Sequence, residues 1–143
     1  MTATIAPNIA DLIPHQAPMV LLDSIIRWDD GYILCRALSH TQADNPLRDA
    51  GKLSVFAGVE YAAQAMAAHA SLRTDGQPAQ RGMIATASRL TPACQWLDEY
   101  PAPLSVRVEL LASNTTSSMC QFQITSGTSQ LLSGQLTALS SQS

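Results

Sequence analysis

Residues 55–73 read as one long helix that has almost no polar side. Between Val55 and Leu72 the clearly polar side chains are those of Glu60, Gln64, His69 and Ser71. A helix that is apolar nearly all round is a buried helix. Ser54 stands where a helix cap is needed, and the many alanines allow a close approach to a sheet. The rest of the chain must therefore form a layer that wraps around this helix.

Strand-like segments supply that layer. They lie at 19–29 and 32–39 before the helix and at 83–96, 104–113, 118–126 and 129–140 after it. Loops are expected at 40–52 and 74–82, and a short helical turn at 8–13. Apolar and polar residues alternate most clearly around Val106 and Val108. This order predicts an α+β fold in which an antiparallel sheet surrounds one helix, as a single domain over residues 1–143.

The composition favours an oligomer, and it argues against binding to nucleic acid. Only 13 % of the residues are charged and 46 % are hydrophobic, so we expect much of the surface to be covered in a homodimer or higher homo-oligomer. The net charge of −3, without a basic block, argues against nucleic acid as a partner. No segment approaches about 20 uninterrupted apolar residues and no signal peptide is recognisable, which predicts a cytoplasmic protein outside the membrane.

The chain has three cysteines, Cys35, Cys94 and Cys120, and three histidines, His15, His40 and His69. The cysteines are widely spaced and form no CxxC pair, which favours reduced and packed thiols. The histidines do not combine with them in the spacing of metal ligands, so neither a metal nor another cofactor is expected. His69 falls on the helical face opposite Glu60 and is interpreted as structural.

The helix carries a carboxylate where burial is expected. Glu60 and Gln64 are four residues apart and share a helical face. Burying an unpaired carboxylate costs several kcal/mol, so such a group is seldom kept without a partner or a use. Removal from water favours the protonated carboxyl, which suits a general acid. The alternative is that Glu60 is half exposed at the start of the helix and is stabilised only by the helix dipole.

A family pattern is recognisable in two blocks of the sequence, LIPHQAPMVLLDSI at 12–25 and EYAAQAM at 60–66. The first resembles L-P-H-R-x-P-F-L-L-V-D and the second resembles E-A-M-A-Q, both of the bacterial β-hydroxyacyl-acyl-carrier-protein dehydratases. The helix GVEYAAQAMAAHA is similar to that of the divergent predicted 3-hydroxyacyl-carrier-protein dehydratases of aryl-polyene gene clusters. The resemblance implies a hot-dog fold, with a sheet wrapped around a central helix, and a dimer with its sites at the interface.

The same resemblance assigns roles to three residues. It places the catalytic carboxylate of the family on Glu60, its helix glutamine on Gln64 as a substrate-binding residue, and its first-block histidine on His15, which we interpret as structural. The implied reaction is the dehydration of a 3-hydroxyacyl thioester, carried by acyl carrier protein or coenzyme A, to the trans-2-enoyl thioester. Glu60 would protonate the departing hydroxyl.

The motif that holds the family's catalytic histidine is missing. Fourteen residues before Glu60 stands Pro46, preceded by Asn45, which can bind a thioester carbonyl or a water but cannot remove a proton. His40 is therefore the candidate base, although a histidine at the edge of a loop is often simply exposed. The backbone N–H groups of Val55 and Phe56 are expected to stabilise the enolate oxygen.

Other interpretations of these residues stay open. The acyl chain is expected beside the helix near Met66, Met83 and Ile84, yet ordinary core packing also accounts for the methionines. A hot-dog thioesterase would use the helix carboxylate to activate water and Asn45 to position its substrate. A non-catalytic chain would instead form a heteromer with an active hot-dog dehydratase, and the missing histidine motif favours that alternative.

Overall fold

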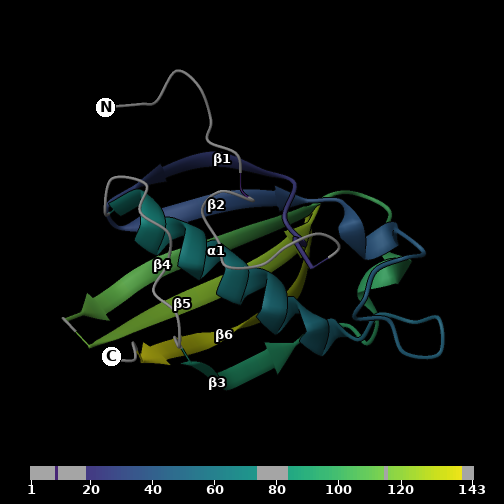
Figure 1. The fold of residues 1–143 in the computed structure, drawn as a ribbon. Coiled ribbons are helices and arrows are strands. Elements are labelled where there is room, and N and C mark those ends of the chain that lie inside the picture. The colour runs from purple at the N-terminus through teal and green to yellow at the C-terminus, as the bar shows by residue number, and fades with distance from the viewer. Residues whose placement is uncertain (1–8, 10–18, 74–83, 115, 140–143) are drawn as a thin grey trace.

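The structure, a computed structural model, describes residues 9, 19–73, 84–114 and 116–139. Six antiparallel strands form one sheet in the order β1-β2-β4-β5-β6-β3, and the sheet curves around a single long helix, α1 (Figure 1). The elements are β1 (Ser24–Asp29), β2 (Tyr32–Ala37), α1 (Gly58–Arg73), β3 (Ile84–Pro92), β4 (Leu104–Ser113), β5 (Ser117–Ser126) and β6 (Ser129–Leu139). The predicted α+β arrangement, an antiparallel sheet wrapped around one helix, is confirmed.

Two of the predicted strands are shorter than expected. β1 begins at Ser24, and β3 ends at Pro92 because the chain then turns toward the start of α1. There the N–H of Leu97 donates to the carbonyl of Leu53 at 2.8 Å. The helical turn predicted at 8–13 lies outside the described residues except for Ile9, which is buried. His15, Met83 and the loop 74–82 also lie outside them.

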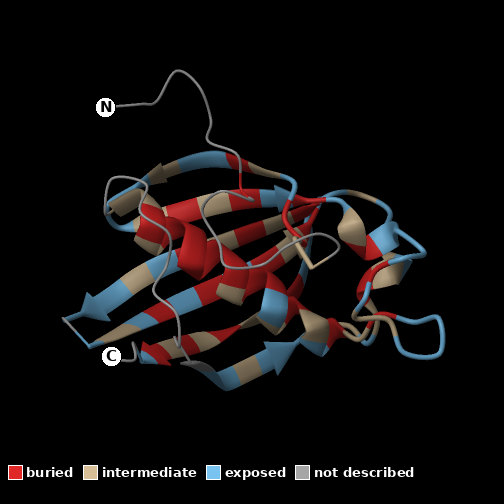
Figure 2. Ribbon diagram, viewed as in Figure 1, coloured by how far each residue is buried: buried red, intermediate tan, exposed pale blue. Residues whose placement is uncertain are grey.

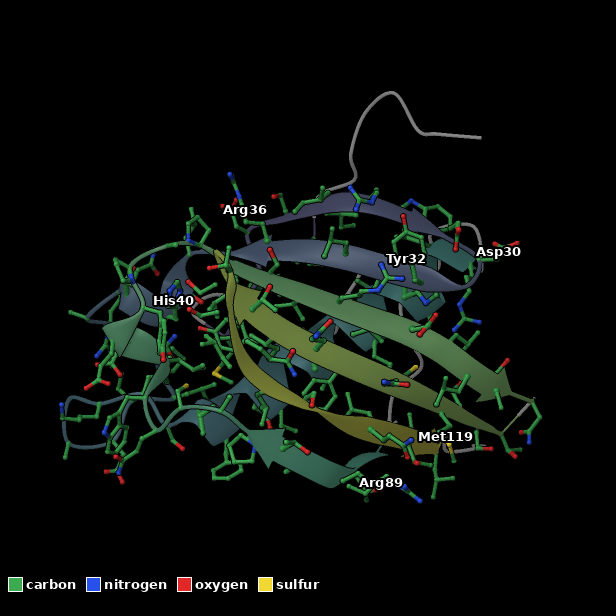
Figure 3. All side chains as sticks on the ribbon, turned by 180° about the vertical axis from the view of Figure 1, so that it is seen from behind. Asp30, Tyr32, Arg36, His40, Arg89 and Met119 are labelled. Carbon is green, nitrogen blue, oxygen red and sulfur yellow. The ribbon has the colours of Figure 1, made fainter. Side chains whose placement is uncertain are left out.

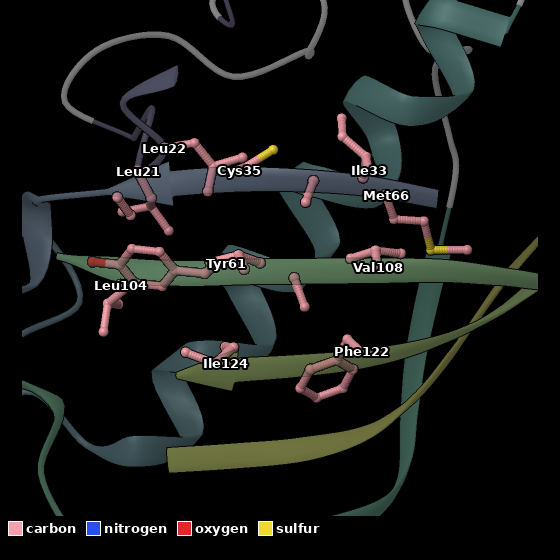
Figure 4. Close-up of a cluster of buried hydrophobic side chains, with 14 of the residues drawn as sticks. Leu21, Leu22, Ile33, Cys35, Tyr61, Met66, Leu104, Val108, Phe122 and Ile124 are labelled. Atoms are coloured by element: carbon pink, nitrogen blue, oxygen red, sulfur yellow. The ribbon is translucent and has the colours of Figure 1, made fainter. Parts of the chain in front are cut away.

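The core lies between α1 and the concave side of the sheet (Figure 2). Buried side chains of α1, Tyr61 and Met66 among them, meet those of the strands (Figure 4). The helix begins in close contact with the sheet, because a Cβ atom on Gly58 would lie 2.7 Å from Ile124 Cδ1 and 3.0 Å from Leu132 Cδ2. A side chain at this position would require the ends of the Ile124 and Leu132 side chains to move, so α1 begins in close contact with β5 and β6.

The cysteines behave as packed thiols. All three are free; Cys35 and Cys120 are buried, and Cys94 is half-buried. Burial raises the pKa of Cys35 to about 12 and that of Cys120 to about 11, so both stay protonated and unreactive. No described helix is long and apolar enough to cross a membrane.

Candidate functional site

Glu60 lies in the first turn of α1, and its side chain is exposed. The expectation that the fold buries this carboxylate is therefore wrong for the single chain, and the alternative of a carboxylate favoured by the helix dipole fits its position. Nearby apolar side chains are also partly exposed: Phe56, in the short 3-10 turn before α1, is 50 % exposed, and Val59 and Ala63 are half-buried. We call these four residues the Glu60 patch.

Gln64, one turn further along α1, is buried and bound to the backbone. Its Oε1 accepts a hydrogen bond from the N–H of Leu21 at 2.9 Å, and its Nε2 donates to the carbonyl of Met19. The side-chain amide thus pairs with the chain before β1 as the backbone of a neighbouring strand would. Because both ends of the amide are occupied, this geometry gives no support to the substrate-binding role, which stays a prediction.

Asn45 is buried in a chain of hydrogen bonds. Its Nδ2 donates to Tyr61 Oη and to the carbonyl of Ser39, both at 2.9 Å, and its Oδ1 accepts from the N–H of Leu47 at 2.9 Å. Ser39 Oγ donates to the carbonyl of Leu21 at 2.7 Å and lies 2.7 Å from Tyr61 Oη, so the tyrosine donates to the serine. Burial raises the pKa of Tyr61 and keeps that proton in place. Asn45 therefore braces its loop against α1, and its predicted contact with substrate stays unsupported.

His40 is buried, at 1 % exposure, at the end of the sheet beyond β2 (Figure 3). Its Nε2 lies 2.7 Å from the carbonyl oxygen of Tyr100, which requires this nitrogen to carry the proton and donate. Burial lowers the pKa of His40, in opposition to the effect of that carbonyl. The structure thus corrects the view of His40 as an exposed loop histidine. With the proton on Nε2, Nδ1 is the basic nitrogen, and it is buried with no hydrogen-bond partner among the described residues. Because a substrate cannot reach Nδ1 on the single chain, this geometry gives no support to the predicted role as the base.

The loop that holds His40 and Asn45 is organised by one arginine. The Arg48 guanidinium donates to the carbonyls of Gln42 at 2.8 Å, Gly51 at 2.8 Å and His40 at 3.2 Å, and it pairs with Asp98 at 3.4 Å. Sequence reasoning singled out neither Arg48 nor Tyr61. The available signals were weak: a lone arginine in a polar loop and a lone tyrosine in an alanine-rich helix.

The amides at the start of the helix have partners. The N–H of Val55 donates to the carbonyl of Gln95 at 2.9 Å, and the N–H of Phe56 donates to Ser54 Oγ at 3.1 Å, which confirms Ser54 as the cap. An oxyanion would have to displace these acceptors. The geometry therefore gives no support to the predicted oxyanion site at Val55 and Phe56.

The described residues give no support to the expected acyl slot. Met66 is only 5 % exposed and packs in the core, as the alternative interpretation held. Met83 lies outside the described residues, and for Ile84 only the backbone is described. A hollow of about 160 Å³ lies at the end of the β4–β5 hairpin, and it is lined by Ala112, Ser113, Asn114, Ser117, Ser118, Met119 and Thr137. None of its lining residues belongs to α1. Among the described residues, no group of three acidic, histidine or cysteine side chains could hold a metal ion.

His69 is the second buried histidine of the described chain. Its Nε2 lies 2.7 Å from the carbonyl oxygen of Asp29, and its ring meets that of Trp28 edge to face at 6.4 Å between centroids. These contacts fasten the C-terminal half of α1 to the β1–β2 hairpin, as expected of a structural histidine. Burial lowers the pKa of His69, against the opposing effect of the Asp29 carbonyl.

The two buried histidines predict a loss of stability in acid. Because the pKa of each is lowered from 6.5 in the folded chain, the unfolded chain binds more protons just below that pH. The contribution of the two neutral histidines to the free energy of unfolding is therefore complete above about pH 6.5, and it is lost as the pH falls below that value. We expect the urea midpoint to fall between about pH 7 and about pH 5, and the fall to be smaller in His69→Gln. An unchanged midpoint would show that the rings are not held neutral.

Comparison with known proteins places the chain in a family. A family model described as ApeP-like, ApeP dehydratase, matches residues 7–143. The fold resembles that of the dehydratase heterocomplex ApeI:P from Xenorhabdus doucetiae, with a TM-score of 0.82 at 18 % identity over 95 % of this chain and 92 % of that one.

More distant structures share the fold. The HP0420 homologue from Helicobacter felis gives a TM-score of 0.65 at 9 % identity, covering 96 % of this chain and 89 % of that one. Thioesterase HI1161 from Haemophilus influenzae gives a TM-score of 0.53 at 12 % identity, covering 81 % of this chain and 76 % of that one. No curated protein matches the sequence. The chain has the hot-dog fold, and it belongs to the ApeP-like dehydratase family.

Proposed function

We propose that this chain forms one half of a site that dehydrates 3-hydroxyacyl thioesters, and that a second hot-dog subunit completes it. Glu60 provides the acid, and the other subunit provides the base. The substrate is carried by acyl carrier protein or coenzyme A, as in fatty-acid or polyene-type biosynthesis in the cytoplasm. The observation that carries the proposal is that Glu60 is exposed, whereas His40 and His69 are both buried and bound to backbone carbonyls.

The chemistry divides between the two subunits. The base removes the proton next to the thioester carbonyl and leaves an enolate. Expulsion of the 3-hydroxyl, protonated by Glu60, releases water and forms the trans-2 double bond. A subunit that covers the Glu60 patch would enclose the carboxyl together with the bound substrate.

The uncovered apolar surface supports a shared site. Phe56 is half exposed beside Glu60, and apolar groups of this size are usually covered when they surround a functional carboxyl. The similar dehydratase from Xenorhabdus doucetiae is itself a heterocomplex, ApeI:P. Because Asn45 is engaged by Tyr61 and Ser39, the thioesterase alternative loses the residue that favoured it.

The test is an assay of trans-2-enoyl thioester hydration, with the 3-hydroxyacyl product measured by mass spectrometry. The purified chain alone should show no turnover, and a mixture with the ApeI component of the Xenorhabdus doucetiae heterocomplex should be active. Turnover by the chain alone would contradict the shared site. Hydrolysis of a saturated acyl thioester, with no hydration, would favour the thioesterase.

A further inference from the structure

The last part of the chain carries no charged side chain. Every aspartate, glutamate, lysine and arginine lies before Leu110, so residues 110–143, which include β5 and β6, contain none. Side chains alternate along both strands, and those that do not face α1 point to the outer face of the sheet (Figure 3). A surface in water usually carries charges, whereas the core of a protein–protein interface is depleted of them. This outer face therefore has the composition of a covered surface.

Apolar side chains gather at one end of this face. Leu111, Met119 and Leu139 are each at least 40 % exposed, and they make up three of the six exposed large hydrophobic side chains of the described residues. The strand register places Ala112, Met119 and Thr137 side by side on β4, β5 and β6. We call Leu111, Ala112, Met119 and Thr137 the Met119 patch. Apolar side chains that cluster on a surface are typical of an interaction site.

The hollow at the end of the β4–β5 hairpin opens beside Met119. Ala112 and Thr137, its neighbours across the sheet, are small, and the space they help to line measures about 160 Å³. A cavity of about 150 Å³ can hold a benzene-sized group, so the hollow can take a methionine side chain from another molecule. At its rim, Asn114 Oδ1 already accepts hydrogen bonds from two N–H groups of its own hairpin, both at 2.9 Å.

A second copy of the chain is the occupant that these features favour. A two-fold axis brings identical surfaces together, and an uncharged surface meets its own copy without repulsion between like charges. The patch also supplies both halves of a contact, an exposed and flexible methionine and a hollow that can take one. A strongly charged partner would lose hydration here and would find no ion pair in return.

The Met119 patch is separate from the Glu60 patch. The helix start that carries Glu60 contacts β5 at Ile124, through Gly58, on the inner face of the sheet. Met119 is five residues from Ile124, about 17 Å along the strand, and it lies on the outer face (Figure 3). A subunit that covers the Glu60 patch therefore leaves the Met119 patch free.

We propose that the Met119 patch, together with the uncharged outer face of β5 and β6, binds the same surface of a second copy of this chain. Each Met119 side chain occupies the hollow of the other copy. The two sheets then pack back to back, and both Glu60 patches stay accessible. The contact gives the homo-oligomer expected from the composition a place on the molecule, and it does not depend on the chemistry proposed for Glu60.

The test compares the mass of the wild-type chain with that of two charged variants by sedimentation. Met119→Glu and Met119→Lys each bring like charges together, so each should have half the mass of wild type, which is 15.2 kDa if this contact is the only one. An equimolar mixture of the two variants should recover the wild-type mass, because opposite charges then meet. Ile26→Glu is the matched control, since Ile26 is an exposed apolar residue on β1, and it should keep the wild-type mass.

A variant without charge and a change of salt complete the test. Met119→Ala should raise the Kd of self-association at least about tenfold, because the anchoring side chain is lost. Added salt should leave the wild-type mass unchanged and should dissociate the mixture of Met119→Glu and Met119→Lys, since only the mixture depends on charge. Equal masses for wild type and Met119→Glu would overturn the inference. So would a mixture that stays at the mass of its components while Met119→Ala associates like wild type.

Discussion

Glu60→Gln will lower the rate of enoyl-thioester hydration by the assembled complex about 10²–10⁴-fold, the usual contribution of a general acid. The substitution keeps the size and the hydrogen-bonding capacity of the side chain but removes the proton that the reaction transfers. Because Glu60 is exposed on the single chain, folding and assembly should be unaffected. The measurement is the hydration rate at saturating substrate, beside the urea midpoint of the variant chain.

The matched control is Glu109→Gln, an exposed glutamate on β4 that loses the same charge. It should leave the rate within about two-fold of the original, as expected for a surface substitution away from a site. If Glu60→Gln has full activity in the complex, the chain is a non-catalytic subunit, and its contribution is confined to the interface.

Gln64→Leu will lower the free energy of unfolding by about 2–4 kcal/mol. The N–H of Leu21 is buried and loses its acceptor, and the carbonyl of Met19 loses its donor. A leucine side chain offers neither group a new partner, so the cost is that of unpaired polar groups rather than that of one hydrogen bond. Urea unfolding followed by circular dichroism would measure the loss.

Gln121→Leu is the control for this variant, because Gln121 is exposed on β5. Its effect should stay within about 0.5 kcal/mol. A Gln64→Leu chain that keeps its stability but raises the KM of the complex would restore the substrate-binding role predicted from sequence, and would contradict the structural one.

The elements of the fold could be predicted because their signals are local. The alternation of apolar and polar residues in β4 and the apolar run of α1 indicate which faces are buried. Six strands and one helix can then be packed in only a few arrangements. The contacts of Gln64, Asn45 and His40 could not be predicted in the same way. Their partners, at Leu21, Tyr61 and Tyr100, are 43, 16 and 60 residues away in the chain.

The exposure of Glu60 could not be predicted from the sequence, for a different reason. The apolar helix around it predicts burial, but whether the first turn of a helix is covered depends on what lies beyond the chain as well as on the chain itself. The bulge of β3 at Arg89, between the pairs Ser88–Gln135 and Thr91–Ser133, had no signal in the sequence either, because a positive φ is usually marked by glycine or asparagine.

The Asn45–Tyr61–Ser39 hydrogen bonds determine how easily a histidine could be accommodated at position 45. A single exchange of Asn45 for an imidazole would place a larger ring among groups that now satisfy one another, and would leave Tyr61 and Ser39 without that amide. The cost falls on the whole network, so several positions would have to change together. If a second subunit supplies the base, as we propose, this packing means that no single substitution at Asn45 would replace it without a loss of stability.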